Sequence, residues 1–103
     1  MEKNLVGKFV CFTGKMETVK QDEQLKFLQS VNGDLITGSN LAAYIKMTDQ
    51  ERAKMTLSGK VNLIVVGKTA VNDTIVKYAG ENGIEKIDEE TYIALLKATK
   101  QGS

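Results

Sequence analysis

The chain has 103 residues, of which 42% are hydrophobic and 26% are charged, a composition that is ordinary for a single globular domain. Lysine and arginine together number 14 and the acidic residues 13, so the net charge of +1 excludes a protein that coats nucleic acid non-specifically. There is no histidine and only one cysteine, which excludes an internal disulfide and removes the commonest general base and metal ligand.

The first third of the chain predicts two strands with a helix between them. Residues 9–12 are wholly apolar, which is typical of a strand that is buried on both faces in the interior of a parallel sheet. Residues 24–31 carry apolar side chains at helical spacing, and the Asn-Gly pair at 32–33 supplies a left-handed stop. A short second strand is expected at 34–37, where a glycine closes it.

Residues 39–57 form the segment whose pattern is the least decisive. Three apolar side chains between 41 and 45 share one helical face, and Thr48 and Glu51 have the spacing of a capping box. The segment is therefore either two helical turns with a break or one short helix that starts near Thr48. Its apolar and methionine side chains either pack it onto the edge of the sheet or dock a partner, and packing is the commoner outcome.

The remaining residues alternate strands with helices. Residues 62–66 are the strongest strand signal, because consecutive branched apolar residues precede a glycine. A helix is expected over 71–81, a fourth strand over 84–87, and a last helix over 89–99 with Asp88 as its cap. This order predicts an α/β fold in which a parallel sheet carries helices on both faces.

Four stretches of this pattern, in the same order, resemble the BRCT domain family. Residues 7–14 (GKFVCFTG) resemble its first strand and turn, and the Asn-Gly pair at 32–33 stands where the family has Gly-Gly after its first helix. Residues 58–67 resemble its third strand, and residues 83–92 resemble its G-I-x-I-I-D-E-x-x-aromatic ending.

We interpret residues 1–103 as one BRCT-like domain with its core at about 5–97, similar to the single BRCT domains of bacterial NAD-dependent DNA ligases and of the large subunit of replication factor C. The resemblance implies three layers, with a four-stranded parallel sheet in the order 2-1-3-4, two helices on one face and one on the other. Residues 39–57 depart from it, as an insert longer than the family's usual connection. The last helix lacks the tryptophan of many members, and Tyr92 or Ile93 takes its place.

The resemblance also implies a function: a non-catalytic binding module of a DNA replication or repair protein, without a metal or other cofactor. Such a module recruits a protein partner or binds a phosphate group, and the alternative is direct binding of DNA ends or nicks through the 5′-phosphate. An intracellular location, in the cytoplasm and nucleoid or in a nucleus, fits an N-terminus without the apolar core of a signal peptide and a single cysteine. No apolar run approaches the ~20 residues that span a membrane. The oligomeric state is open, with a monomer favoured.

A phosphate site is predicted where the first strand ends, at Thr13 and Gly14. Ligands of open parallel sheets bind at this edge, and a hydroxyl close to a glycine amide can donate to one phosphate group. The resemblance implies this role for both residues and adds a lysine near the start of the next crossover helix, for which Lys77 is the candidate. The family's lysine falls one residue away from Lys77, and one residue turns a helix by ~100°. The competing interpretation is that Thr13 caps a turn that Gly14 allows, and that Lys77 is solvated.

Lys15 and Lys20 are possible contacts to the DNA backbone. The BRCT domain of replication factor C has an arginine before its first helix that helps to hold the 5′-phosphate, and that place here is Gln21, with Lys20 beside it. Lysine can neutralise a phosphate but lacks the bidentate fork of arginine. The DNA-end interpretation is therefore weaker here than in replication factor C.

A small α/β enzyme is the third interpretation, and the residues argue against it. Residues 67–69 (GKT) superficially resemble a nucleotide-binding loop, but the glycine required five positions earlier is Asn62. Cys11 lies inside the first strand, where a buried thiol is unreactive. The acidic pairs that open two helices are explained as caps and as partners of the helix dipole.

Overall fold

A computed structural model describes residues 4–56 and 58–101 of the chain. The ends of the predicted domain, residues 1–3 and 102–103, lie outside the described part, and so does residue 57, the last of the predicted insert. Residues 1–3 also belong to the N-terminus in which no signal peptide is expected. Within these two ranges, no helix combines the length and the apolar character that crossing a membrane requires.

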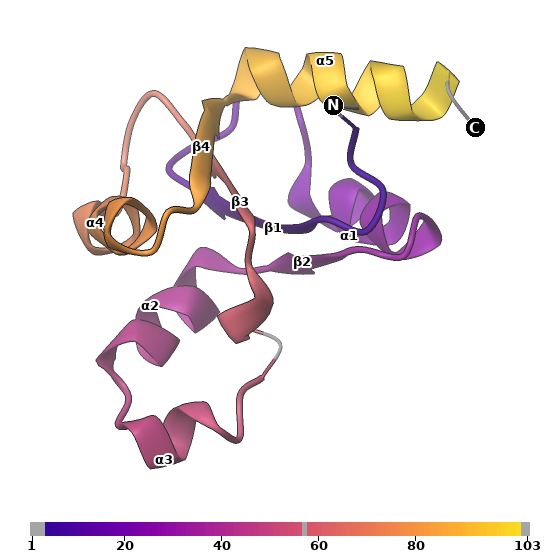
Figure 1. Ribbon diagram of the computed structural model, residues 1–103. Coiled ribbons are helices and arrows are strands. Elements are labelled where there is room, and N and C mark those ends of the chain that lie inside the picture. Colours follow the sequence, from indigo (N-terminus) through magenta and orange to yellow (C-terminus); the bar gives the residue numbers. More distant parts are fainter. Residues whose placement is uncertain (1–3, 57, 102–103) are drawn as a thin grey trace.

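Four parallel strands form one sheet in the order β2-β1-β3-β4 (Figure 1). β1 covers Phe9–Thr13, β2 Asp34–Ile36, β3 Leu63–Val66 and β4 Glu85–Asp88. β1 pairs with β2 on one side and with β3 on the other, and β3 also pairs with β4. The predicted strands, their parallel arrangement and the interior position of the first strand are confirmed.

The helices between the strands follow the predicted order, with different starting points. Their bounds are Gln21–Ser30 for α1, Gly38–Lys46 for α2, Asp49–Arg52 for α3, Asp73–Glu81 for α4 and Glu89–Gln101 for α5. α1 begins earlier than its apolar spacing indicated, because the Gln24 amide already donates to the Lys20 carbonyl. α4 begins later, because Asn72 is its extended N-cap and accepts the Thr74 amide with its side chain.

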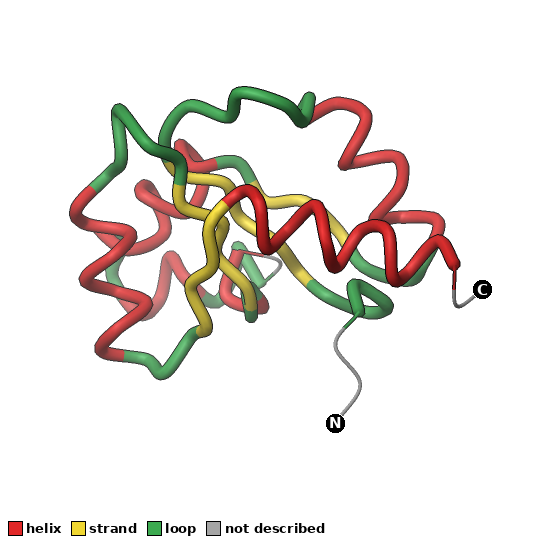
Figure 2. The backbone as a smooth tube through the Cα atoms, turned by 90° about the horizontal axis from the view of Figure 1, so that it is seen from above, coloured by secondary structure: helices red, strands yellow, loops and turns green. Residues whose placement is uncertain are grey.

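Successive residues of the central strands point to opposite faces of the sheet, and each face carries its own core. Val10 and Phe12 pack on the face that α1 and α5 cover, whereas Cys11 packs on the face that α2 and α4 cover. The residues of β3 alternate in the same way. The helices therefore form layers on both sides of the sheet, and Figure 2 shows α5 lying across the strands from above.

The 39–57 segment contains two helical pieces with a break, α2 and α3, which was one of its two predicted structures. A short 3-10 turn, Ser58–Lys60, then leads into β3. α2 contacts β1 and α4, and Leu41 is fully buried in the second core. The segment therefore packs on the domain's own sheet, as the commoner of its two expected outcomes had it, although α2 covers a face that runs from the edge strand β2 to β1 rather than the edge alone. α2 starts almost directly after the edge strand β2 and turns its apolar stripe back over a face of the sheet.

Tyr92 occupies the centre of the core beneath α5. Its side chain is fully buried, and its ring meets the ring of Phe12 edge-on, with centroids 5.1 Å apart. Its hydroxyl donates to the Gln24 side-chain carbonyl at 2.7 Å, and Gln24 is itself buried. Of the two residues expected to replace the tryptophan of the last helix, Tyr92 is thus the one that fills the core.

Replacing Tyr92 with phenylalanine should lower the free energy of unfolding by about 1–3 kcal/mol, because the buried Gln24 carbonyl would lose its donor. Tyr78→Phe is the matched control, since Tyr78 is only half-buried, and a change of at most about 0.5 kcal/mol is expected. Urea unfolding of both variants measures the difference. Equal stabilities would show that the Tyr92–Gln24 bond contributes nothing.

Cys11 should be unreactive in the folded chain. Its side chain is fully buried in β1, and burial raises the pKa of its thiol to about 12, so little thiolate forms near neutral pH. We expect a disulfide reagent at pH 8 to label the native chain far more slowly than the urea-unfolded chain. Labelling at the same rate in both states would contradict the burial of β1.

Candidate functional site

Thr13 ends β1 at the carboxyl edge of the sheet, and its side chain is only 3% exposed. Its hydroxyl oxygen accepts the backbone N–H of Asn72 at 2.9 Å, and Asn72 is the N-cap of α4. The bond ties the end of the central strand to the start of the crossover helix. A hydroxyl whose oxygen accepts one bond still has a proton to donate, so Thr13 retains the chemistry that a phosphate contact needs.

Gly14 follows in a left-handed conformation, with a φ of 88°, and the loop between β3 and α4 lies against it. A Cβ atom at this position would come within 2.7 Å of the Thr69 carbonyl oxygen, so only glycine fits. The Lys15 amide donates to the same carbonyl at 2.9 Å, and the Gly67 amide donates to the Thr13 carbonyl at 2.8 Å. Gly14 therefore allows the turn, as the competing interpretation expected, whereas the Thr13 hydroxyl bonds the start of α4 and not its own turn. The phosphate role of both residues stays a prediction.

Lys77 is not brought toward this turn. α4 buries Ile75 and Ala79 against the sheet, and Lys77 lies between them in sequence with an exposed side chain. Two residues rotate a helix by about 200°, so Lys77 projects from the face opposite Ile75. The structure thus joins Thr13 and Gly14 but directs the third predicted ligand away from the sheet.

Lys15 and Lys20 lie on the loop between β1 and α1, and both side chains are exposed. Within the described residues neither of them forms an ion pair, whereas Lys68 at the same edge lies 3.9 Å from Glu17. The loop is not loose, because Met16 and Val19 pack against the first core. Lys15 and Lys20 are therefore cations that extend from an anchored backbone.

Glu89, the first residue of α5, holds this loop and was not identified from the sequence. Its carboxylate accepts the backbone amides of residues 17–19 at 3.0, 2.7 and 2.9 Å. The pKa of Glu89 is lowered, chiefly by the hydrogen bond from the Val19 amide. The bonds from the Glu17 and Thr18 amides and the charge of Lys68 add to this effect, and together they outweigh desolvation. Three successive amides that converge on one anion form a backbone nest. The only signal in the sequence was an acidic residue at a helix start, which the helix dipole already explained.

A cavity of about 160 Å³ opens beside Glu89 at the carboxyl ends of β3 and β4. Its lining residues are Glu17, Thr18, Val66, Gly67, Lys68, Asp88, Glu89, Glu90 and Ile93. Four carboxylates against one ammonium give it a negative potential that disfavours a phosphate, and it includes none of the three predicted phosphate ligands. No group of histidine, cysteine and acidic side chains among the described residues could hold a metal ion.

Three of the four carboxylates of this cavity have structural partners: Glu17 lies beside Lys68, Glu89 accepts the loop amides, and Asp88 caps a helix. Asp88 accepts the Thr91 amide at 2.8 Å and so caps α5, as predicted from the sequence. Its hydrogen bonds with Thr91 lower the pKa of Asp88. Asp88 and Glu89 therefore serve the start of α5 and the neighbouring loop.

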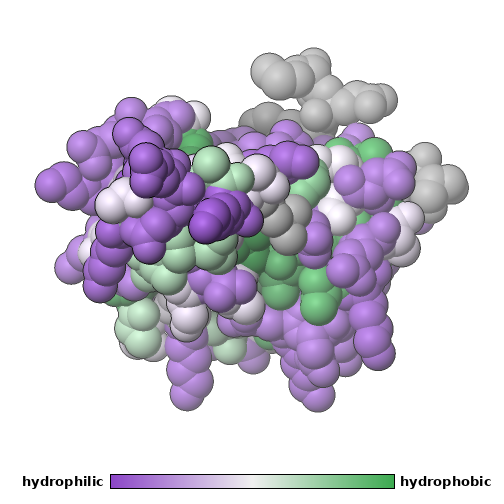
Figure 3. Space-filling model, turned by 90° about the horizontal axis from the view of Figure 1, so that it is seen from below, coloured by the Kyte–Doolittle hydropathy of each residue, from purple (hydrophilic) through white to green (hydrophobic). Residues whose placement is uncertain are grey.

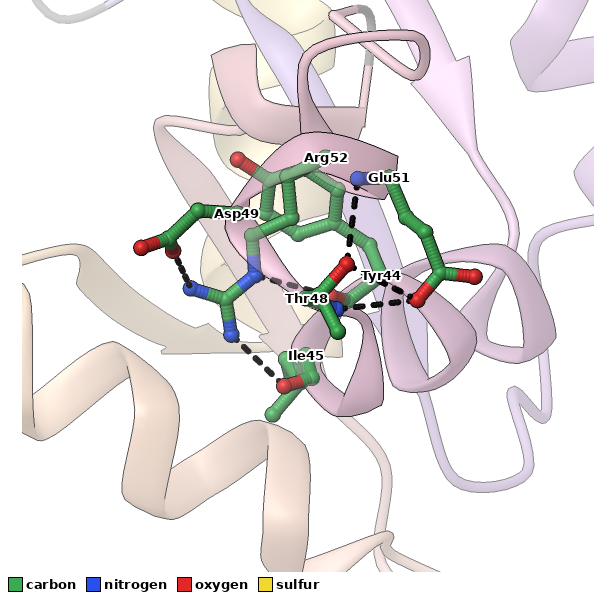
Figure 4. A network of polar contacts seen from close by, with 6 residues as sticks. All are labelled: Tyr44, Ile45, Thr48, Asp49, Glu51 and Arg52. Carbon is green, nitrogen blue, oxygen red and sulfur yellow. Dashed lines mark hydrogen bonds and ion pairs between the residues drawn. The ribbon is translucent and has the colours of Figure 1, made fainter.

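The α2–α3 segment was the other candidate surface, and a polar network orders it (Figure 4). The Thr48 side chain accepts the Glu51 amide while the Glu51 carboxylate accepts the Thr48 amide, so the predicted capping box is confirmed. These bonds lower the pKa of Glu51. Figure 3 views the molecule from the side of α2 and α3 and shows a mostly hydrophilic face with a small apolar area. The docking role of this segment stays a prediction.

Arg52 ties α3 to the end of α2. Its guanidinium donates to the carbonyls of Tyr44 at 3.1 Å and Ile45 at 2.7 Å, which belong to the last turn of α2. The same group lies over the Tyr44 ring, 5.3 Å from its centroid, and 3.8 Å from an oxygen of Asp49. One side chain thus bonds two carbonyls at the end of one helix while it anchors the next.

No protein-family model, curated protein or solved structure was found to match the chain. The assignment to a family and to a function therefore depends on the sequence motifs and on the geometry described above.

Arg52→Ala should destabilise the α2–α3 segment by about 1–2 kcal/mol, because two charge-assisted hydrogen bonds are lost. Amide exchange in α3 should accelerate while exchange in β3 stays unchanged. Lys54→Ala is the control, because it removes an exposed cation close to Arg52 in sequence. If both variants exchange at the same rate in α3, Arg52 does not anchor the segment.

Acid should destabilise the fold through Glu51, Asp88 and Glu89. The fold lowers the pKa of each carboxyl below its ordinary value, which is 4.5 for the two glutamates and 3.8 for Asp88. Each carboxylate therefore contributes its full stabilisation above the ordinary pKa. This contribution is lost as the pH falls through the lowered pKa. The urea midpoint should therefore decline as the pH falls below about 4.5. In Glu89→Gln this decline should be shallower, and an identical decline would contradict the role of the Glu89 carboxylate.

Proposed function

We propose that this chain is a BRCT-like domain, a non-catalytic module that recruits or positions a machine of DNA replication or repair. The observation that carries the proposal is that each sequence motif of the resemblance falls on the strand, helix end or turn that the family pattern assigns to it. The four stretches that resemble the family coincide with β1 and its turn, the end of α1, β3, and β4 with the start of α5. The four strands of the sheet have the order 2-1-3-4 that the resemblance implies.

The layering supports the same assignment. α1 and α5 cover one face and α4 covers the other, and the aromatic residue of the last helix is buried in the core. α2 is an addition beside α4, from the segment that departs from the family pattern. A fold shared with a family does not by itself define a ligand, so the ligand is argued from the carboxyl edge.

We infer that the ligand is a phosphate group, in particular the 5′-phosphate of a DNA end or nick. Support for this proposal comes from the two exposed cations Lys15 and Lys20, which extend from the anchored β1–α1 loop directly after the buried Thr13. Lys77 would have to reach back from the outer face of α4, so we assign it the smaller contribution. With a net charge of +1 and few cations, binding by this domain alone would be weak.

A module that binds only a protein partner is the second candidate. It is favoured by the 3% exposure of Thr13, which leaves little of its hydroxyl accessible, and by the acidic cavity at the same edge. In that case the α2–α3 segment and the cavity are the first surfaces at which to seek the partner.

Fluorescence anisotropy with 5′-phosphorylated and 5′-hydroxyl duplexes separates the two candidates. We expect tighter binding of the phosphorylated duplex, with a log–log salt slope of about 2–3 from two or three phosphate contacts. Lys15→Ala and Lys20→Ala should each weaken it by about 1–2 kcal/mol. Lys97→Ala, at an exposed position of α5, is the control for net charge.

Equal affinity for the two duplexes, with no effect of either loop substitution, would reject the phosphate proposal. Equal weakening by all three lysine substitutions would indicate a diffuse field around the domain and no defined site.

A further inference from the structure

The β1–α1 loop is held by core contacts and by backbone hydrogen bonds to two other segments. Met16 and Val19 anchor it in the first core, and the Lys15 amide is bonded to the Thr69 carbonyl. The three following amides, of residues 17–19, all donate to the carboxylate of Glu89. The loop is thus tied to a helix 70 to 72 positions away in sequence.

We propose that Glu89 is a positioning residue, which holds the β1–α1 loop in the conformation from which Lys15 and Lys20 engage a phosphate. The phosphate ligand in this inference rests on the proposed function, whereas the bonds between Glu89 and the loop are observed in the structure. Glu89 itself touches no ligand in this scheme. It acts through the backbone of the loop, and the lysines on either side of the bonded amides make the contacts.

The physical basis is preorganisation. Hydrogen bonds from amides to an ionised carboxylate are stronger than neutral ones, and three of them restrict three consecutive residues. Glu89 belongs to α5, which Tyr92 anchors in the core, so the restraint is transmitted from a rigid element. A loop that is ordered before binding loses less conformational entropy when the ligand arrives.

The charge of Glu89 makes the proposal testable, because two roles of this residue predict opposite changes in DNA affinity when the charge is removed. A carboxylate near a phosphate site repels the ligand, so removal of its charge should strengthen DNA binding if Glu89 acts only through its field. If Glu89 positions the loop, its removal should weaken binding in spite of the lost repulsion.

The test compares three variants of the full chain: Glu89→Gln, Glu89→Asp and Glu90→Gln. Glu89→Gln keeps the length but not the charge, and Glu89→Asp keeps the charge but shortens the reach by one methylene. Glu90→Gln is the matched control, because it removes the same charge from the next position, whose carboxylate does not bond the loop. The measurements are amide exchange of residues 17–19, with β3 as the internal reference for global stability, and the affinities for 5′-phosphorylated and 5′-hydroxyl duplexes.

We expect both Glu89 variants to accelerate exchange at residues 17–19 by roughly tenfold or more relative to β3. The preference for the 5′-phosphorylated duplex should fall by roughly three- to tenfold in both, while Glu90→Gln changes neither quantity. A purely structural Glu89 would alter exchange and stability but leave this preference intact, and that result would overturn the proposal. Stronger phosphate preference in Glu89→Gln with no change in Glu89→Asp would overturn it in favour of a field effect.

The failure of the proposed function has a different signature. If the wild-type chain binds both duplexes equally, the phosphate ligand is wrong, and the exchange data alone decide whether Glu89 orders the loop. Unchanged exchange at residues 17–19 in both variants would reject the positioning role whatever the DNA binding shows.

Discussion

The burial of β1 on both of its faces determines the arrangement of the other elements. Val10, Cys11 and Phe12 leave almost no surface exposed, so the strand needs a neighbour on each side and helices above and below. β2 and β3 supply the hydrogen-bonded neighbours, and the two clusters of apolar side chains that meet β1 bring in the helices. A strand so enclosed can present only its ends to a ligand.

The carboxyl end of β1 is crowded as a result. The chain must leave the sheet at Gly14 while the loop that follows β3 passes over the same place. Close approach of the two backbones requires glycine at Gly14 and again at Gly67, where a Cβ atom would lie 2.5 Å from the Lys15 carbonyl oxygen. Ala70 of the same loop adopts a φ of 57°, which is uncommon for a residue with a side chain. The turn that was predicted as a phosphate cradle is therefore also the point where two crossovers are packed together.

Most of the fold could be predicted because its signals are local. The apolar run of β1, the branched residues of β3 and the Asn-Gly pair after α1 each report on the conformation of their own residues. The capping box of α3 and the cap of α5 were predictable for the same reason, since each cap lies within three positions of its partner. The placement of α2 over a face was missed, because the apolar stripe of a helix does not say which surface it meets.

The unpredicted features join residues that are distant in sequence. Tyr92 bonds Gln24, and the Leu5 amide bonds the Thr99 hydroxyl at 2.8 Å across the length of the chain. Glu89 binds the β1–α1 loop over a similar separation. Gln24, Thr99 and Glu89 look like ordinary surface residues in the sequence, and only the fold brings each of them to its partner. The same limit applies to Lys77, whose residue type was suitable but whose direction depended on the register of α4.

The distribution of charge at the carboxyl edge separates groups that serve the fold from groups that remain available. Asp88 and Glu89 are engaged by amides, and Lys68 lies beside Glu17. The side chains of Lys15 and Lys20 are exposed and form no ion pair in the described part of the chain, yet they extend from a backbone that is held by core contacts and by a carboxylate. Ordering a loop costs conformational entropy, and the core contacts of the loop and its bonds to the Glu89 carboxylate offset that cost. The same restraint fixes the backbone from which the two cations extend, and for this reason we propose the β1–α1 loop, rather than α4, as the place of the ligand.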